Sequence, residues 1–200
     1  MNFLAHLFLA GDDDASIIGN LAGDFVKGPL HERFEAGIRA GITEHRRIDA
    51  FTDSHPQVSA FRRVLIPEHG HYARVIADVF FDHFLALSFD EYSAEPLEEF
   101  LRRIYGVLDA HLAELPGRLG YVYPIMRDEG WIPSYRSIEG IETALRNMSH
   151  RLSRHPHLET SVHHLVDSRR ELQRRFEAFF PDVIAFAERL RGIGDVKSDR

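Results

Sequence analysis

The chain contains no cysteine among its 200 residues, and this absence limits the chemistry open to it. Without thiols the protein forms no disulfides, and the sulfur-ligated zinc sites of many small domains are excluded. Any metal ion must therefore be held by nitrogen and oxygen atoms.

Long hydrophobic runs are also missing. No apolar stretch approaches the roughly 18 residues that a membrane-spanning helix needs. The opening run, MNFLAHLFLAG, is apolar, but it lacks a basic segment, contains His6 and is followed at once by Asp12, Asp13 and Asp14. It is therefore a poor secretion signal. We expect a cytoplasmic protein that has no membrane or nucleic-acid partner.

The composition, 44% hydrophobic and 28% charged, is typical of one globular domain. Apolar residues recur at helical spacing, and no alternating strand pattern stands out. We expect helices over 14–28, 31–52, 69–87, 95–114 and 138–151, and a long helix that ends near residue 190. The predicted fold is an all-α, single-domain helical bundle over 1–191, followed by a disordered tail over 192–200.

Proline positions indicate where these helices are interrupted. Five prolines are expected in the connections: Pro67, Pro116, Pro124, Pro133 and Pro156. The segment 115–135 contains too many breaks for one continuous helix. We expect it to cover the functional site with its aromatic residues.

Ionisable side chains fall on the inward faces of three expected helices. Phe34, Ile38 and Ile42 define an apolar stripe, and continuing at about 100° per residue brings His45 and Asp49 into the same arc. An isolated histidine and aspartate four residues apart also fit a simple helix salt bridge.

The other two helices repeat the pattern. The same count places Asp82 and His83 toward the interior, and it places Asn20 and Asp24 at the edge of an apolar face. A single aspartate in such a position is more often a cap or the partner of an arginine. Buried ionisable groups are unfavourable unless they are paired or bind a metal. Three helices that direct such groups inward predict a metal site inside the bundle.

Positive charge is concentrated in one segment, although the net charge is −7. Residues 146–175 contain seven arginines and three acidic residues, a local charge of +4, which leaves −11 for the remainder. The segment fits either a solvated helix surface or a docking surface for an acidic partner.

Five motifs carry a resemblance to a known family: NFLAHL, GNLAGDFVKG, HRRIDAFTDSHP, DVFFDHFL and EGWIPSYRSIEGIETALRNMSHRL. In this combination and order the chain resembles the acyl carrier protein phosphodiesterases, from Asn2 to about Phe180. The resemblance implies an all-α fold related to the HD-domain phosphohydrolases and a requirement for a divalent cation, usually Mn²⁺. It also implies hydrolysis of the phosphodiester that joins 4′-phosphopantetheine to a serine of holo-acyl carrier protein (holo-ACP), releasing apo-ACP. The HD signature has an adjacent His-Asp pair, whereas the adjacent pair here is Asp82-His83.

The residue types suit this implied reaction. Nitrogen and oxygen ligands accommodate Mn²⁺, Mg²⁺ or Fe²⁺. We expect a metal-ligand set of Asp24, His45, Asp49 and Asp82. His6 and His83 are expected to transfer a proton to the leaving serine or to complete the coordination, so that Asp24, His6 and His83 form the catalytic set.

Substrate contacts are expected beside the metal. The candidates are Asn20, Lys27, Arg46 and Arg47, of which the two arginines fit exposed helix charges equally well. Two alternative functions stay open. One is a phosphohydrolase of nucleotides or other small phosphorylated metabolites, and the other is a non-catalytic helical protein that binds ACP.

Overall fold

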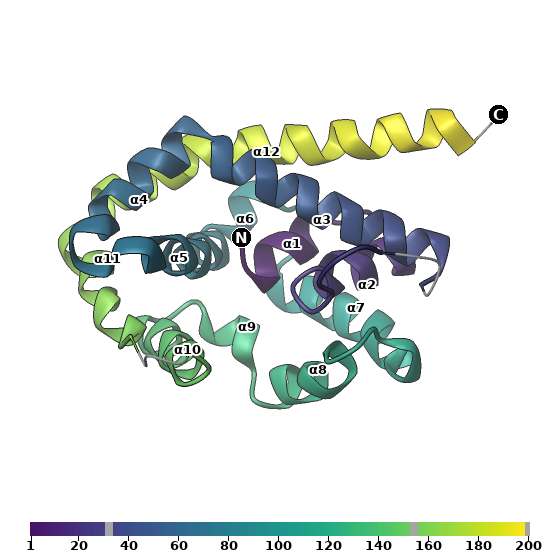
Figure 1. The fold of residues 1–200 in the computed structure, drawn as a ribbon, viewed down its shortest axis with the longest axis horizontal. Helices are drawn as coiled ribbons and strands as arrows, with labels where there is room; N and C mark the ends of the chain where they lie inside the picture. The colour runs from purple at the N-terminus through teal and green to yellow at the C-terminus, as the bar shows by residue number, and fades with distance from the viewer. Residues whose placement is uncertain (31–33, 153–155, 199–200) are drawn as a thin grey trace.

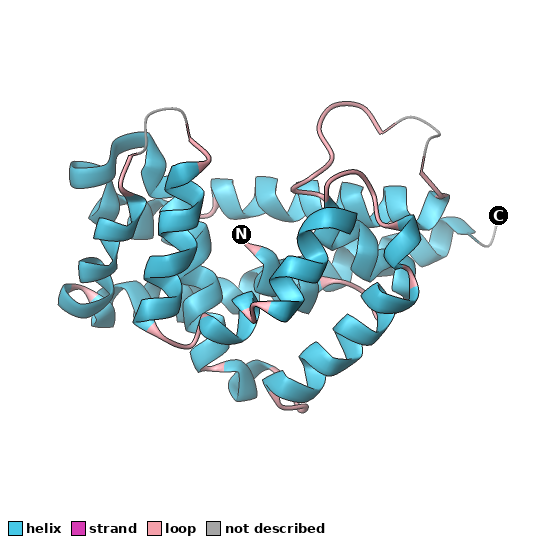
Figure 2. Cartoon of the chain, turned by 90° about the horizontal axis from the view of Figure 1, so that it is seen from below, coloured by secondary structure: helices cyan, strands magenta, loops and turns pink. Residues whose placement is uncertain are grey.

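The computed structural model describes residues 1–30, 34–152 and 156–198, and within these ranges the chain forms helices and no strand (Figure 1, Figure 2). The α-helices are α1 (Phe3–Leu9), α2 (Asp14–Ala22), α3 (Ala36–Ser54), α4 (Pro56–His69), α5 (Ala73–Leu87), α6 (Phe89–Tyr92), α7 (Leu97–Ala110), α8 (Leu119–Asp128), α9 (Trp131–Ser134), α10 (Ile138–His150), α11 (His163–Asp167) and α12 (Arg169–Ser198). Three short 3₁₀ helices are η1 (Gly70–Tyr72), η2 (Leu112–Glu114) and η3 (Leu158–Val162). The predicted all-α, single-domain fold is confirmed.

Helix boundaries differ from the sequence prediction in several places. Helix α2 starts one residue after its cap Asp13, whose carboxylate accepts the backbone N–H of Ser16 at 2.9 Å, and it ends well before Gly28. Residues 31–33, where the next helix is expected to start, lie outside the described residues. Helices α1 and α4 are not anticipated by the sequence. Helix α12 continues to Ser198, whereas the sequence predicts a disordered tail from 192.

Prolines do not separate helices as consistently as expected. Pro67, Pro124 and Pro133 lie inside α4, α8 and α9. A proline removes one backbone donor, and in α4 the burial of Phe61 and Leu65 outweighs that loss. The break expected within 115–135 is present, because Gly130 adopts a left-handed conformation (φ 63°) between α8 and α9.

Helices α2 and α3 pack unusually closely, and two glycines allow this contact. A Cβ built on Gly19 would lie 2.6 Å from the carbonyl oxygen of Ile38 and 2.7 Å from Cα of Gly41. Because no side chain separates the backbones at this point, the loop that follows α2 is held against α3. This contact brings Asp24 next to His45.

Apolar packing places α1 at the centre of the molecule. Figure 1 shows α3 and α4 running beside the long α12, with α8, α9 and α10 on the opposite side and the N-terminus between these groups. Aromatic rings of α5 and α12 form much of the core, including Phe81, Phe84 and Phe176. Helix α1 is buried in this setting, so His6 is only 1% exposed. None of the helices in the described ranges is long and apolar enough to cross a membrane.

Candidate active site

Four of the predicted site residues converge where α1, α2 and α3 meet. His6 comes from α1, Asp24 from the loop after α2, and His45 and Asp49 from α3. His6 Nε2 lies 3.1 Å from Asp49 Oδ1, and His45 Nε2 lies 3.4 Å from Asp49 Oδ2 and 3.7 Å from Asp24 Oδ1. One ligand atom from each of His6, His45 and Asp49 can be chosen so that all three lie within 4.8 Å of one another. We call these four residues the His-Asp cluster.

The orientation of His45 is fixed on several sides. Its Nδ1–H donates to the backbone carbonyl of Asn20 at 2.8 Å, which leaves Nε2 as the ring nitrogen that faces the two carboxylates. The ring stacks on His6, with the ring centroids 3.7 Å apart. Gly23 lies so close that an added Cβ would be 2.2 Å from Cγ of the His45 ring. A backbone carbonyl that holds the second ring nitrogen is typical of metal-binding histidines.

Asp49 is the acidic centre of the cluster. Burial would raise its pKa, but the interactions with His45 and His6 and the nearby α-amino group of Met1 outweigh burial and keep the pKa far below its usual range. The α-amino nitrogen of Met1 lies 3.0 Å from Asp49 Oδ1 and 3.4 Å from Asp78 Oδ1. Asp49 is therefore ionised at neutral pH, and positive charge is drawn to this point.

The second imidazole of the cluster is uncharged at neutral pH. Burial and the neighbouring His45 lower the pKa of His6 to about 3, even though the hydrogen bond to Asp49 opposes this change. Its Nδ1 is buried and has no hydrogen-bond partner among the described residues. A neutral imidazole has a free electron pair that can bind a metal, so the position of His6 beside His45 and Asp49 and its unpartnered Nδ1 favour the coordinating role.

Asp82 lies outside the His-Asp cluster. One carboxylate oxygen accepts the N–H of Leu4 at 2.7 Å and the other accepts the N–H of Ala5 at 3.1 Å. Its carboxylate therefore binds the free amides at the start of α1, in place of the predicted role as a metal ligand. Burial raises the pKa of Asp82 to about 7, against the opposing effect of these two amides. Asp82 affects the cluster indirectly, by holding the helix that carries His6.

The structure also separates His83 from the cluster. Its Nδ1–H donates to the carbonyl of Tyr135 at 2.7 Å, and burial lowers its pKa. Tyr135 accepts a hydrogen bond from Asn2 through its hydroxyl, and Trp131 stacks on Phe3. The end of the segment 115–135 therefore contacts the start of α1, and His83 anchors it. Its expected role as a cover for the functional site stays a prediction.

The predicted substrate-binding residues do not gather around the cluster. The Asn20 side chain donates to Glu44 at 3.0 Å and to the carbonyl of Ser16, while Arg46 donates to the carbonyls of Val26 and Gly28. Arg46 thus braces the loop that carries Asp24. Arg47 lies two positions from His45, about 200° around the helix, and faces away. Lys27 is exposed, and its positive charge lowers the pKa of Asp24, although burial raises that pKa overall.

A cavity of about 300 Å³ adjoins the cluster. It is lined by charged residues that the sequence did not predict as part of the site. Asp24 and Asp78 line it together with Arg118 and Arg151. Asp78 precedes Asp82 by one helical turn, and this spacing is the signal that could have revealed it. Arg151 belongs to the basic segment 146–175, but no local pattern links Arg118 to the cluster.

Comparison with known proteins relates the chain to one family. The family model for acyl carrier protein phosphodiesterase matches residues 1–183. Proteins named acyl carrier protein phosphodiesterase include one from Enterobacter sp. (strain 638), 35% identical over 94% of this chain and 98% of that protein. Another, from Escherichia coli O157:H7, is 36% identical over the same shares of the two chains.

The chain belongs to the acyl carrier protein phosphodiesterase family. No solved structure matches it, so the expected relation to the HD phosphohydrolases stays a prediction.

This member of the acyl carrier protein phosphodiesterase family has a second group of possible ligands at the end of α4. Glu68, His163 and His164 offer atoms within 4.8 Å of one another. The Glu68 side chain is 55% exposed and pairs with both imidazoles, at 3.4 and 3.7 Å. The His-Asp cluster, which is more buried, therefore matches a catalytic metal better.

The basic segment of this family member does not form one uniform surface. Arg146 pairs with Glu142, and Arg175 donates to Gln57 and Glu171. Arg154 and His155 lie outside the described residues. Arg170 and Arg174 are exposed on α12. The predicted docking of an acidic partner on this segment stays a prediction.

Proposed function

We propose that this protein is a metal-dependent phosphodiesterase that hydrolyses the bond between 4′-phosphopantetheine and a serine of holo-ACP. Membership of the acyl carrier protein phosphodiesterase family supports the reaction and the substrate. The observation that carries the proposal for this chain is the convergence of His6, Asp24, His45 and Asp49 beside a cavity that also contains two arginines.

The His-Asp cluster fits a divalent cation. His45 Nε2 faces carboxylate oxygens of Asp24 and Asp49, at 3.7 and 3.4 Å, so a cation placed between them would meet one ring nitrogen and two carboxylates. Two imidazoles and two carboxylates form a nitrogen and oxygen donor set that suits Mn²⁺ or Fe²⁺, and Mg²⁺ through the carboxylates. We propose Mn²⁺, held by His6, His45, Asp49 and Asp24.

The proposed mechanism assigns a task to each group. When bound, the cation supplies Lewis-acid charge for the anionic phosphodiester. His45 is kept in the coordinating tautomer by the carbonyl of Asn20, and α1 is held in place by Asp82, so the two imidazoles are preorganised. Arg118 and Arg151 line the same cavity and can neutralise the phosphate oxygens.

Mass spectrometry of holo-ACP tests the proposal directly. Incubation with the protein and Mn²⁺ should convert holo-ACP to apo-ACP with loss of the prosthetic group, and EDTA should stop the conversion. His45→Asn should lose both bound Mn²⁺ and turnover, whereas the control Glu68→Gln, in the second group of ligands, should keep both. The proposal is wrong if no divalent cation supports loss of the prosthetic group, or if His45→Asn behaves as wild type.

A cytoplasmic location stays a prediction from the sequence. Fractionation of cells, followed by detection of the protein in each fraction, tests it.

A further inference from the structure

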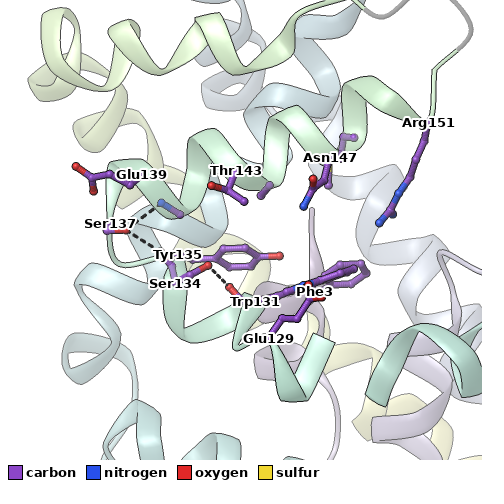
Figure 3. Close-up of a pocket in the computed structure, with 13 residues that line it drawn as sticks. Phe3, Glu129, Trp131, Ser134, Tyr135, Ser137, Glu139, Thr143, Asn147 and Arg151 are labelled. Carbon is purple, nitrogen blue, oxygen red and sulfur yellow. Dashed lines mark hydrogen bonds between the residues drawn. The ribbon is translucent and has the colours of Figure 1, made fainter. Parts of the chain in front are cut away.

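A pocket of about 310 Å³ lies between α10 and the segment that carries α9 (Figure 3). Thr143 and Asn147 of α10 and Arg151, which directly follows the helix, line one side at successive intervals of four residues. Figure 3 shows these side chains directed from α10 toward Tyr135, Trp131 and Phe3. The walls combine aromatic surface with hydroxyl and amide groups, and the volume falls within the range typical of small-molecule sites.

The pocket adjoins the cavity beside the His-Asp cluster. Phe3, Met148 and Arg151 line both the pocket and the cavity that contains Asp24 and Asp78. Arg151 is therefore at the junction between the two spaces, where its guanidinium lies 5.6 Å from the ring centre of Trp131. From this junction the pocket extends along α10 toward Gly140, close to the start of the helix.

The dimensions of this pocket match one part of the substrate. From Gly140 to Arg151 the helix rises by about 16 Å at 1.5 Å per residue. The pantetheine arm has about a dozen bonds from the phosphate ester oxygen to the sulfur, which extend to roughly 14 Å at ~1.2 Å per bond. The arm carries a dimethyl group, a hydroxyl and two amides, and the pocket offers aromatic rings together with Thr143 and Asn147.

We propose that this pocket receives the pantetheine arm of holo-ACP. The phosphate lies at Arg151, beside the His-Asp cluster, and the thiol points toward the start of α10. The assignment rests on the proposed function, because it takes holo-ACP as the substrate. It makes Thr143 and Asn147 specificity-determining residues for the arm and makes Arg151 a phosphate-binding residue.

Calorimetric titration of the full-length protein distinguishes binding of the arm from binding of the phosphate. The ligands are 4′-phosphopantetheine and pantetheine, which lacks the phosphate. Thr143→Phe fills the pocket and should weaken the binding of both ligands by about tenfold or more, whereas the matched control Glu142→Phe places the same ring on α10 outside the pocket and should bind both ligands as wild type does. Arg151→Gln should weaken the binding of 4′-phosphopantetheine by about tenfold and change the affinity for pantetheine by less than about twofold, since only the phosphate accepts a charge-assisted hydrogen bond from Arg151.

Steady-state kinetics supply the second readout. Thr143→Phe and Asn147→Leu should raise KM for holo-ACP, while cleavage of bis(p-nitrophenyl) phosphate, which has no arm, should keep its wild-type KM. Circular dichroism checks that the variants fold, and we expect them to fold because Thr143 and Asn147 are exposed.

The two proposals fail in different ways. Wild-type values of both ligand affinity and KM for holo-ACP in Thr143→Phe would overturn the pocket assignment while leaving the reaction intact. Absence of any prosthetic-group loss with the wild-type protein would overturn the proposed function, and the titrations would still report whether the pocket binds the arm.

Discussion

Gly23→Ala tests whether the position of the His45 ring controls the site. A Cβ at Gly23 would lie 2.2, 2.3 and 2.6 Å from three atoms of the ring, Cγ, Cδ2 and Nδ1. Non-bonded carbon atoms pack at about 3.5 Å or more, so the ring must move by roughly 1.3 Å. The backbone at Gly23 is helical (φ −54°, ψ −37°), so alanine itself adds no strain there.

A shift of that size breaks the geometry that prepares His45 for a metal. The bond from Nδ1 to the carbonyl of Asn20 is 2.8 Å long, and hydrogen bonds of this type weaken beyond about 3.2 Å. The stacked ring of His6 limits the directions in which His45 can move. Loss of such a supporting bond typically lowers metal affinity by about 10- to 100-fold, and we expect a loss of this size for Mn²⁺.

The assay is calorimetric titration with Mn²⁺, followed by turnover of holo-ACP measured by mass spectrometry. Gly106→Ala is the matched control, because Gly106 is inside α7 and an added Cβ meets nothing within 4 Å. Alanine there should leave Mn²⁺ affinity unchanged and raise the free energy of unfolding by about 0.5–1 kcal/mol. Wild-type Mn²⁺ affinity and turnover in Gly23→Ala would refute the reasoning.

Three further predictions follow from the contacts of the site. Burial raises the pKa of Asp82 to about 7, so between about pH 4 and pH 7 the folded state keeps a proton that the unfolded state has released, and the free energy of unfolding falls as pH rises through that interval. Asp82→Asn should remove this pH dependence of the free energy of unfolding, which urea titrations of both proteins at a series of pH values measure. Parallel curves of unfolding free energy against pH would contradict the prediction. His6→Gln should lose bound Mn²⁺ and turnover, whereas His83→Gln should mainly lower the free energy of unfolding, because His83 binds the Tyr135 carbonyl. Metal analysis and thermal unfolding distinguish the two variants. An equal loss of turnover with metal retained in both would contradict the separate roles of His6 and His83. Reversing the exposed Arg170 and Arg174 to glutamate should raise KM for holo-ACP at low salt and blunt its salt dependence. An unchanged KM across a salt series would place docking elsewhere.

Local pattern alone was sufficient for the fold class and for part of the site. The helical stripe of residues 34–49 correctly places His45 and Asp49 on the inward face of α3, because the 100° rotation per residue is a property of the helix itself. The absence of cysteine restricts any metal ligands to nitrogen and oxygen whatever the fold. The family motifs are spread over nearly the whole chain and were sufficient to predict the family, because sequence similarity needs no coordinates.

Tertiary packing decided which of the inward groups meet. The sequence alone does not distinguish Asp82 from Asp49 as a metal ligand, since both are predicted to be carboxylates on inward helix faces. The docking of α1 against α5 brings the amides of Leu4 and Ala5 onto Asp82, and the close contact of Gly19 with Gly41 brings Asp24 to His45. The sequence specifies which way a residue faces on its own helix, but the distances between helices depend on packing among segments far apart in the chain. Burial then sets the charge of His6 and Asp82, because desolvation acts only once those neighbours are in place.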